Sequence, residues 1–458
     1  MQSNFITLMA DSFAGLTLKD LDDQIVDRAK IAILDAIAVA YAGHKTDTAR
    51  IVCDIFSEFP AAKNSATVWF KGLSSNYIFA AVSNCALVHN MIHDDMNESS
   101  RGHAGNLIVP SVLAIAEAYD RPGDEVVPAI VVGYEAMGRV AKPAVAHSVG
   151  RGFRGTSTYG PFGVAAAASK ILKLNAVETA NAIAGAASFS LGLLEPFNTG
   201  SMEWRFQNSV VIMGGMMAAL TAKNGARSAA TALEGDGGFI SAFCGNEVKD
   251  EVVSAWMAES KTLGKEYDIS KTYFKPYSTC GYNQIGCNIA LNVIKKHSLT
   301  ADMLKEIIVK VSPDNKAYPG VDFNGPFATP DLALLSKPFM LGAAVVTRDL
   351  QIDTYQSRLN DPEILKVAKM VRLESDLKMT PLDTEIRFIT KDGQVFAGDL
   401  RQANLEAFIN NRGLAVQKFH SLAGGSIDSQ TIDEIAEMVF NIEDLKTVSD
   451  LTAKLKRL

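Results

Sequence analysis

The sequence has few cysteines, and their arrangement excludes two classes of protein. The five residues, an odd number, are Cys53, Cys85, Cys244, Cys280 and Cys287. No two of them have the Cys-x-x-Cys spacing that is typical of zinc sites. We therefore expect free thiols in a reducing compartment, with neither a disulfide framework nor a structural zinc ion.

Long apolar runs and clustered basic residues are also missing. The most apolar window, residues 209–222, is too short to span a bilayer, which takes roughly 20 residues. The N-terminus has no basic region followed by an apolar stretch and a cleavage site, so no secretory signal is predicted. Binding to nucleic acid requires more clustered cations than the C-terminal Lys454, Lys456 and Arg457. The sequence thus predicts a cytoplasmic protein that binds neither membrane nor nucleic acid.

The composition is that of an ordinary globular protein. The 458 residues include 44 Lys and Arg against 51 Asp and Glu, a net charge of −7, and 48% are hydrophobic. The 34 Gly and 15 Pro are near average, which excludes collagen-like and low-complexity sequences. At roughly 100–200 residues per domain, this length predicts two or three domains whose cores need no disulfide or metal.

Up to about residue 265, the hydrophobic pattern predicts one helix after another. Apolar residues recur at three- and four-residue steps between residues 21 and 41. A helix is also expected at 109–119, where Pro110 would occupy the first turn. Further helices are predicted at 127–140, 159–172 and 176–194. The last two are rich in Gly and Ala, which favours close packing between helices.

The pattern changes near residue 270. Residues 306–312 alternate between apolar and polar positions, as a half-buried strand does. Two more strands are predicted within 384–400, around the turn at 391–393, because its Asp-Gly pair tolerates the positive φ angles of a hairpin. Helices are expected between these strands at 283–296, 338–347 and 362–371, and again near the C-terminus at 428–440 and 442–458.

Together these patterns predict a mainly α protein with two domains. A large all-helical domain comprises residues 1–267 and 403–458, and a smaller α+β domain, residues 268–402, is inserted between them. The C-terminal segment is expected to pack back on the N-terminal body, which leaves the inserted domain as a lid-like lobe. The cleft between the two is the expected ligand site.

The densest group of titratable residues lies at 89–103. Three interpretations are open: a metal site formed by His93, Asp94 and His103, a solvated loop whose acids cap helices, or an acid/base site. We favour the third, because imidazole both takes and gives protons near neutral pH and no tight metal-ligand spacing is present. The group consists of His89, His93, Asp94, Asp95, Arg101 and His103.

Five motifs in order resemble the MmgE/PrpD family, which includes 2-methylcitrate dehydratase and cis-aconitate decarboxylase. His89 opens a run similar to the family's His-x-x-Asp-x-Asp-Asp-Thr, in which Asp94 and Asp95 match the paired acids. The His103-Ala104-Gly105 segment then precedes Val109-Pro110, as in the family pattern. The other similar segments lie at 152–158, 233–239, 275–280 and 337–346.

The resemblance implies several properties. The fold would be a large helical domain with a smaller α+β domain, the chain would form a homodimer, and no cofactor would be needed. The substrate would be a small polycarboxylate that undergoes dehydration, decarboxylation or epimerisation next to a carboxylate. Such reactions build negative charge on the substrate, so cations and hydrogen-bond donors must already be aimed at it.

Several polar positions of the family pattern are replaced in this chain. Ile92 stands at the position of the first acid of the run, and Met96 at that of its Thr. Trp204 replaces a Lys, while Gln284 and Arg154 each replace a His. Trp204 and Met96 in place of polar groups make the expected pocket drier and less cationic, which favours a less charged substrate with an apolar portion.

The remaining polar residues carry the predicted chemistry. His103 is the expected acid or base, and Asp94 or Asp95 is expected to orient it. His93 could stand in for the missing acid, and Tyr282 could donate a proton or a hydrogen bond.

A second group of residues is expected to hold the substrate. Lys275, Arg205 and Arg154 are predicted to bind carboxylates, Arg through two parallel hydrogen bonds and Lys as a compact charge. Arg101, Gln284, Trp204 and Met96 are the other substrate-binding candidates. Neither a metal site nor a cofactor motif is predicted.

The sequence thus predicts a lyase or isomerase that moves a proton beside the carboxylate of a small organic acid. Its substrate is expected to differ from 2-methylcitrate and cis-aconitate. One alternative is a catalytically silent relative that binds a small acid or serves as a structural partner, because several titrating positions are lost. Another is a biosynthetic enzyme with a new, less charged substrate.

Overall fold

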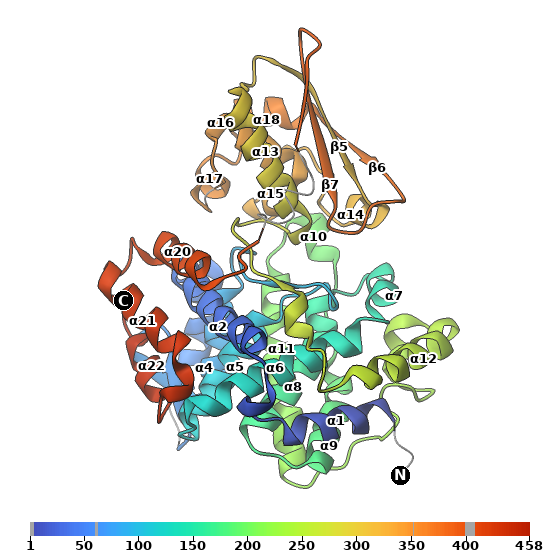
Figure 1. Cartoon of the computed structure of the whole chain (residues 1–458), viewed down its shortest axis with the longest axis vertical. Helices are drawn as coiled ribbons and strands as arrows, with labels where there is room; N and C mark the ends of the chain where they lie inside the picture. Colours follow the sequence, from blue (N-terminus) through green and yellow to red (C-terminus); the bar gives the residue numbers. More distant parts are fainter. Residues whose placement is uncertain (1–3, 60–62, 351, 399–407) are drawn as a thin grey trace.

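The computed structural model describes residues 4–59, 63–350, 352–398 and 408–458. The described chain is mainly helical with a small α+β portion, which confirms the predicted fold class. Figure 1 shows a broad helical body and, above it, a narrower lobe that holds the main β-sheet.

The body contains the helices of the N-terminal half and those of the C-terminal end. Its N-terminal helices are α1 (Phe5–Gly15), α2 (Asp23–Gly43), α3 (Asp47–Ser57), α4 (Tyr77–Val88), α5 (Gly105–Ala118), α6 (Val126–Ala141), α7 (Val145–Gly150), α8 (Gly155–Ile171), α9 (Ala176–Ala186), α10 (Glu195–Thr199), α11 (Glu203–Lys223) and α12 (Lys249–Glu259). The C-terminal helices are α20 (Arg412–Ala423), α21 (Ser429–Phe440) and α22 (Ser449–Lys454). Helices α20 and α21 pack on α2, so the C-terminal segment lies against the N-terminal body.

Helix α8 forms the centre of the body. It packs against α6, α11, α5 and α9, and nearly all of its residues are buried. A helix that is covered on all sides needs no polar face, and the Gly and Ala of α8 allow its neighbours to approach closely. The prediction of a Gly- and Ala-rich buried helix at 159–172 is therefore confirmed, with the helix beginning earlier, at Gly155.

In the part of the lobe that the structure describes, six helices accompany a four-stranded sheet. The sheet order is β6-β5-β7-β8, with β5 parallel to β6 and antiparallel to β7. The strands are β5 (Leu304–Val311), β6 (Val371–Ser375), β7 (Thr384–Thr390) and β8 (Val395–Ala397). The helices are α13 (Gln284–His297), α14 (Pro313–Ala317), α15 (Pro330–Leu335), α16 (Lys337–Thr347), α17 (Ile352–Ser357) and α18 (Pro362–Ala368).

The predicted strand at 306–312 and the predicted hairpin around 391–393 are both present, as β5 and as β7 with β8. Gly393 in the turn has a φ of 88°, a left-handed conformation that glycine adopts without steric cost. Residues 399 and 400, the end of the second predicted strand, lie outside the described residues.

The described residues form two hydrophobic cores, which do not follow the predicted domain boundaries completely. One fills the body and includes residues of α20, α21 and α22. The other fills the lobe, but Ile92, Phe197 and Trp204 of the N-terminal half also belong to it. The domain limits at 267/268 and 402/403 stay predictions, and the second limit lies outside the described residues.

The structure differs from the sequence-based expectation in several short elements. Helix α5 begins at Gly105, so Pro110 lies inside the helix rather than in its first turn. The helix expected at 176–194 ends as α9 at Ala186 and is followed by a single 3₁₀ turn. Four short strands in the predicted all-helical region and at its edge were not expected. They are β1 (Ser65–Val68), β2 (Leu73–Asn76), β3 (Met96–Asn97) and β4 (Thr272–Tyr273).

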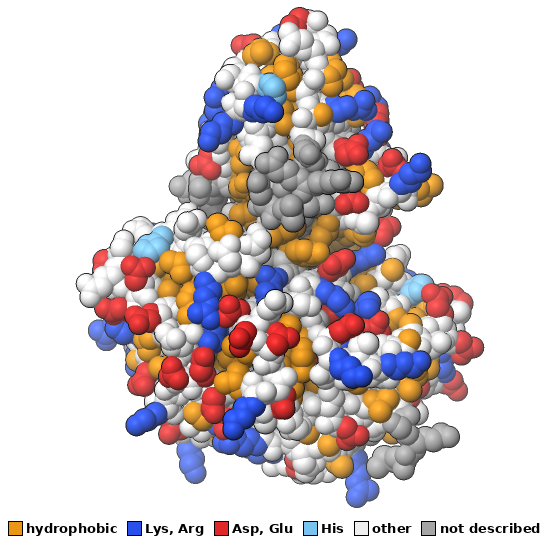
Figure 2. Space-filling view, viewed as in Figure 1, with side chains coloured by type: hydrophobic (Ala, Val, Ile, Leu, Met, Phe, Trp, Pro, Cys, Tyr) orange, Lys and Arg blue, Asp and Glu red, His pale blue; other side chains and the backbone are white. Residues whose placement is uncertain are grey.

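On the face shown in Figure 2, the coloured side chains form no large region of one charge. Acidic and basic side chains alternate over the body and the lobe on the face shown in Figure 2. Among the described helices, none has both the length and the hydropathy that crossing a bilayer requires.

Candidate active site

The polar run at 89–103 forms the connection between α4 and α5, at the base of the lobe. Strand β3 within it pairs with β4, with Met96 opposite Tyr273, and this pairing brings the run beside the segment that leads into α13. The side chains of the run point into the protein: His89, His93, Asp94 and Asp95 are all at most 5% exposed. Charged groups this deeply buried need specific partners.

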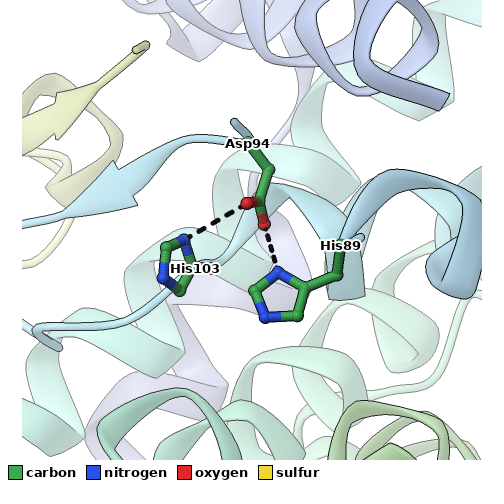
Figure 3. A group of neighbouring side chains, drawn as sticks. All are labelled: His89, Asp94 and His103. Carbon is green, nitrogen blue, oxygen red and sulfur yellow. Dashed lines mark hydrogen bonds and ion pairs between the residues drawn. The ribbon is translucent and has the colours of Figure 1, made fainter. Parts of the chain in front are cut away.

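The Asp94 carboxylate lies between two imidazole rings, as Figure 3 shows. Its Oδ2 is 2.7 Å from His89 Nδ1 and accepts a second hydrogen bond, also 2.7 Å, from the Asn106 amide. Its Oδ1 is 3.5 Å from His103 Nδ1. Burial alone would raise the pKa of Asp94, but the two rings, these hydrogen bonds and the nearby Lys275 lower it below its usual value. Asp94 is therefore an anion that accepts hydrogen bonds.

Both ring nitrogens of His89 have protein partners. Nδ1 donates to Asp94, and Nε2 accepts a 2.7 Å hydrogen bond from the Arg154 guanidinium. Burial, which outweighs the attraction of Asp94, lowers the pKa of His89 to about 4, so the ring is neutral at neutral pH. The edge of the ring meets Trp204 at a centroid distance of 5.1 Å. His89 thus links Asp94 to Arg154 and has no free nitrogen for a substrate.

His103 differs from His89 because one of its ring nitrogens is free. Nδ1 lies 2.7 Å from the Asp95 carbonyl oxygen, and since a carbonyl only accepts, Nδ1 carries the proton. Nε2 then has a lone pair and no hydrogen-bond partner among the described residues. The side chain is 15% exposed, and burial lowers the pKa of the ring well below its usual value. His103 is therefore a neutral imidazole that can accept a proton at Nε2.

Two adjoining cavities border His103. The outer one has a volume of about 270 Å³ and the inner one about 30 Å³. They share Arg101, His103, Cys280 and Tyr318 in their walls, so the His103 ring stands where they meet. The outer cavity lies between β3, β4, the start of α13 and the segment before β7, which places it between body and lobe.

Two cations face these cavities. Arg154, at the N-terminal end of α8, borders the inner cavity and donates to the Trp204 carbonyl at 2.7 Å and to the Asn208 side chain at 3.0 Å. Burial lowers the pKa of Arg154 to about 10, which leaves it charged at neutral pH. Arg101 borders both cavities, has a positive φ of 46° and forms a 3.3 Å ion pair with Asp314 of the lobe.

Three predicted substrate ligands have other partners and line neither cavity. The Lys275 ammonium is fully buried and donates to the Ile92 carbonyl at 2.5 Å. Arg205 donates to the Asn90 carbonyl and to Asp331. The Gln284 amide is hydrogen-bonded to backbone groups of the 277–279 segment. Their contact with substrate stays a prediction, and in the structure they support the segments around the cavities.

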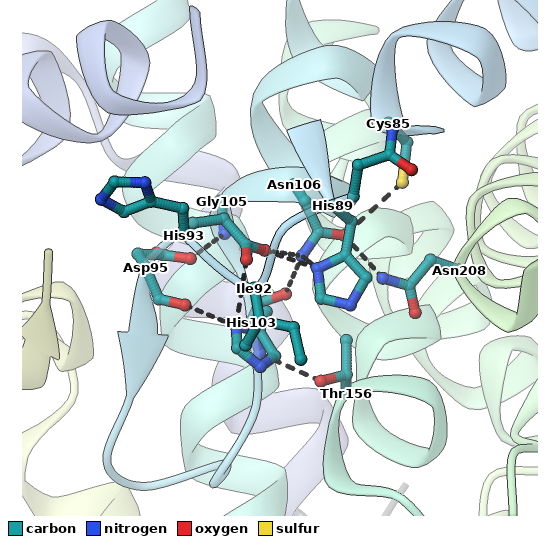
Figure 4. Close-up of polar contacts among 12 residues, drawn as sticks. Cys85, His89, Ile92, His93, Asp95, His103, Gly105, Asn106, Thr156 and Asn208 are labelled. Carbon is teal, nitrogen blue, oxygen red and sulfur yellow. Dashed lines mark hydrogen bonds and ion pairs between the residues drawn. The ribbon is translucent and has the colours of Figure 1, made fainter. Parts of the chain in front are cut away.

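The other predicted site residues divide between the cavities and the protein interior. Met96 and Tyr282 line the outer cavity, and Trp204 lines the inner one. The Asp95 carboxylate accepts from Tyr134 and from the Gly105 amide, so it caps α5, and burial together with Asp94 raises its pKa to about 7. His93 is buried away from both cavities, and Figure 4 shows its ring turned away from His89 and His103.

The metal-site alternative takes a different form in the structure. The His93 ring points away from His103, so these two rings do not share a ligand position. Instead, His89, Asp94 and His103 bring their ligand atoms within 4.8 Å of one another. The surroundings do not suit a divalent cation: Arg154 occupies His89 Nε2, the Asp95 carbonyl occupies His103 Nδ1, and Lys275 adds positive charge. We therefore derive no chemistry from a metal ion here.

Sequence reasoning missed several residues of the site. Tyr318 lines both cavities, yet it lies in a loop with no motif, so no sequence signal pointed to it. Thr156 accepts a 3.1 Å hydrogen bond from the His103 backbone, and Asn106 holds Asp94. Thr156 falls in the similar segment at 152–158, which was a usable signal. The locking of His89 by Arg154 depends on residues 65 positions apart.

A neutral imidazole at a cavity wall can accept a proton, and a guanidinium beside it can stabilise an anion. The comparison with known families gives a more specific result. The MmgE/PrpD N-terminal domain matches residues 7–251, so the chain belongs to the MmgE/PrpD family, and the resemblance of its motifs is confirmed.

Three curated relatives cover almost the whole chain. The cis-aconitate decarboxylase of Homo sapiens is 25% identical over 468 residues, which cover 98% of this chain and 94% of the human protein. That of Mus musculus is 26% identical over 98% of this chain and 93% of its own. That of Aspergillus terreus is 23% identical over 96% of this chain and 93% of its own. These are low identities, and they show common ancestry over the full length.

Proposed function

We propose that this chain is a lyase of the dehydratase and decarboxylase type that acts on a small organic acid without a cofactor. The observation that carries the proposal is His103, whose Nδ1–H is fixed on the Asp95 carbonyl while Nε2 is left free beside two cavities. Family membership and the decarboxylase relatives support the same class of reaction.

In the proposed mechanism, His103 Nε2 exchanges a proton with the carbon next to a carboxylate. In an elimination it takes the proton while the leaving group departs. In a decarboxylation the ring first takes up a proton from solvent at Nε2. The C–C bond then breaks, CO₂ leaves, and the electron pair that stays on the carbon takes this proton, which leaves the ring neutral again. Asp94 stabilises the imidazolium that forms, because its Oδ1 is 3.5 Å from Nδ1. Epimerisation, in which the proton returns to the other face, uses the same group.

Arg154 and Arg101 are the cations we assign to the substrate carboxylate. Both border the inner cavity with His103, so a carboxylate placed there lies beside the base. Charge that develops on the substrate is then stabilised by groups that need no rearrangement.

We further propose that the substrate is less charged than a tricarboxylate. Among the described residues, the outer cavity is lined by one guanidinium, that of Arg101, next to His103. Its wall also contains two carboxylates, Glu98 and Asp383, which repel further carboxylates. Apolar and aromatic side chains form much of the remaining wall: Met96, Tyr273, Tyr282, Ile285, Tyr318, Leu382 and Phe408. A wall of this kind favours an acid with an apolar portion in the outer cavity.

A substrate panel followed by NMR in D₂O tests the function. The panel contains citrate, 2-methylcitrate, cis-aconitate, itaconate and larger apolar monocarboxylic acids. We expect turnover, with deuterium incorporated next to the carboxylate, to be fastest for a less charged acid.

His103→Asn retains a donor to the Asp95 carbonyl but lacks Nε2, and it should lower kcat by about 10²–10⁴-fold with little change in KM. Wild-type turnover in this variant would contradict the assignment.

A catalytically silent protein is the second candidate function. It is favoured by Ile92 and Trp204, two apolar side chains that line the inner cavity where the family pattern has polar groups. In that case a panel acid would raise the melting temperature in a thermal-shift assay but give neither product nor deuterium exchange.

We also propose that the protein is a cytoplasmic homodimer. The five free, buried thiols are compatible with a reducing compartment. Support for the dimer comes from α11, where Val210 and Met217, seven residues apart on one face, are 45% and 47% exposed. Phe189 and Leu193 lie beside this face and are exposed as well, and apolar patches of this kind often mark interfaces.

A further inference from the structure

The backbone that leads to Asp94 is held in an unusual way. Residues 90–93 lie between α4 and β3 outside any helix or strand, so their carbonyls need partners other than a regular ladder. Side chains supply them for four successive residues. The donors are Arg205 to Asn90, Ser278 to Met91, Lys275 to Ile92 and Lys418 to His93.

Three of these four donors are cations, and they come from distant parts of the chain. Arg205 belongs to α11, Lys275 to the segment before α13, and Lys418 to the C-terminal helix α20. Hydrogen bonds from charged donors are shorter and stronger than neutral ones. They hold a segment in which Ile92 has a φ of 50°, a strained conformation for a β-branched residue.

Lys418 is the most distant donor, and it is itself fixed. Its ammonium donates to the His93 carbonyl at 2.9 Å and to Asp35 of α2 at 2.7 Å, and both side chains are at most 5% exposed. The His93 carbonyl belongs to the peptide that links His93 to Asp94. Two residues further on, the Asp95 carbonyl accepts the hydrogen bond from His103 Nδ1–H. A shift of the 93–94 peptide therefore moves both groups next to His103 Nδ1, the Asp94 carboxylate and the Asp95 carbonyl.

We propose that Lys418, held by Asp35, is a positioning residue that acts through the His93 carbonyl to keep the His103 ring in its Nδ1–H form. Its importance for turnover rests on the proposed function, but its effect on the ring does not. The C-terminal helix would thus contribute to the site without contacting the substrate.

The chain contains a matched control for this role. Lys30, also buried and on α2 like Asp35, donates to the Phe440 carbonyl at 2.8 Å and to Glu443 at 2.6 Å. It joins the C-terminal segment to α2 with the same chemistry, one lysine between a carbonyl and a carboxylate, but away from residues 89–103. Lys418→Met and Lys30→Met each remove one buried ammonium and leave an unbranched side chain of nearly the same size as lysine.

NMR of the imidazoles gives a readout that does not depend on turnover. The chain has 7 His, and the His103→Asn variant assigns the His103 signal in protein labelled with ¹³C-histidine. In Lys418→Met we expect its Cδ2 shift to move from the Nδ1–H value toward the Nε2–H value. In Lys30→Met it should stay at the wild-type value. With an acid that is turned over, Lys418→Met should lower kcat by about 10²-fold, as a misplacement of about 1 Å does, with KM nearly unchanged.

The proposal is overturned if folded Lys418→Met keeps the wild-type His103 shift, or if Lys30→Met changes it equally. If Lys418→Met does not fold, Asp35→Asn decides, because it preserves shape and weakens only the hold on the ammonium; the same shift of smaller size is expected. If neither variant folds, the pair is structural only and the proposal is wrong. If no acid is turned over but the His103 shift responds as expected, the proposed function fails and the positioning role stands.

Discussion

Asp94 and Asp95 are adjacent residues with opposite electrostatics. Asp94 accepts from His89 and Asn106 near cationic groups, and its pKa is lowered. Asp95 points the other way, toward Tyr134 and the start of α5, where burial and the Asp94 charge raise its pKa to about 7. Two carboxylates so close to each other cannot both be stabilised as anions without separate partners.

Replacing Asp95 should change how stability depends on pH. The pKa of Asp95 in the folded protein, about 7, lies above the ordinary value of 3.8, so between these values the unfolded chain binds fewer protons. Wild-type stability should therefore fall as pH rises from about 4 to 7. Asp95→Asn has no carboxyl group to titrate, so its stability should not fall in this way, and its amide oxygen can still accept the hydrogen bond from Gly105. Each pKa unit corresponds to ~1.4 kcal/mol, so the variant should gain stability relative to wild type across this window.

Urea unfolding at several pH values between 4.5 and 8 measures this difference. An exposed acid, Asp250, provides the control, and Asp250→Asn should follow the wild-type curve. A constant difference between Asp95→Asn and wild type would contradict the prediction.

At the level of single residues, the sequence identified much of the site but not its geometry. The resemblance led to His103, Arg154 and Asp94, because motif positions survive at low identity. It also led to Lys275, whose hydrogen bond to Ile92 depends on residues 183 positions apart. No local pattern states whether a buried lysine faces a cavity or a carbonyl. The sequence also does not show which charged groups surround each buried carboxylate, and these groups lower the pKa of Asp94 but raise that of Asp95.

Among the elements, helix α6 packs against Asp268, which holds the 89–103 connection in place. Gly138 of α6 lies so close to Asp268 that a Cβ there would be 1.7 Å from Oδ2. Asp268 accepts hydrogen bonds from Asn97 at 2.9 Å and from Ser99 at 2.7 Å, both in the connection that ends at His103. The absence of a side chain at Gly138 thus allows α6 to pack against the group that anchors this connection.

Gly138→Ala should therefore destabilise the protein and disturb the site. The added methyl group displaces Asp268, and overpacking of this kind costs about 1–3 kcal/mol. We expect a lower melting temperature and a shifted His103 NMR signal. Gly150→Ala, at the end of α7, has no atom within 4 Å of the new Cβ and should be close to wild type. Equal melting temperatures for the two variants would show that α6 tolerates the methyl group.

The elements that the sequence predicted are those with long or strongly patterned segments. Helix α2, strand β5 and the β7–β8 hairpin have clear periodicity or turn chemistry. Strands β1 to β4 have at most four residues, too few for a period to be detected, and they depend on pairing. The start of α5 was missed because its cap is Asp95, ten residues upstream, rather than a residue just before the helix.

For the whole molecule, the change in sequence character near residue 270 was sufficient to predict a second lobe. It could not show that Ile92, Phe197 and Trp204 of the first half complete the core of that lobe. Because these side chains cross the junction, the inner cavity is walled by both parts of the structure. Ion pairs add to the junction, with Arg101 bound to Asp314 and Arg205 to Asp331.

The proposed homodimer leads to a prediction at this largest scale. A twofold interface uses the same patch on both copies, so one substitution changes it twice. Met217→Glu would place a charge within the α11 patch formed by Phe189, Leu193, Val210 and Met217. We expect light scattering to give a dimer for the wild type and a folded monomer for Met217→Glu at micromolar concentration. Met257→Glu on α12, where Met257 is 38% exposed, should remain a dimer. A monomeric wild type would refute the dimer, and a dimeric Met217→Glu would place the interface on another face.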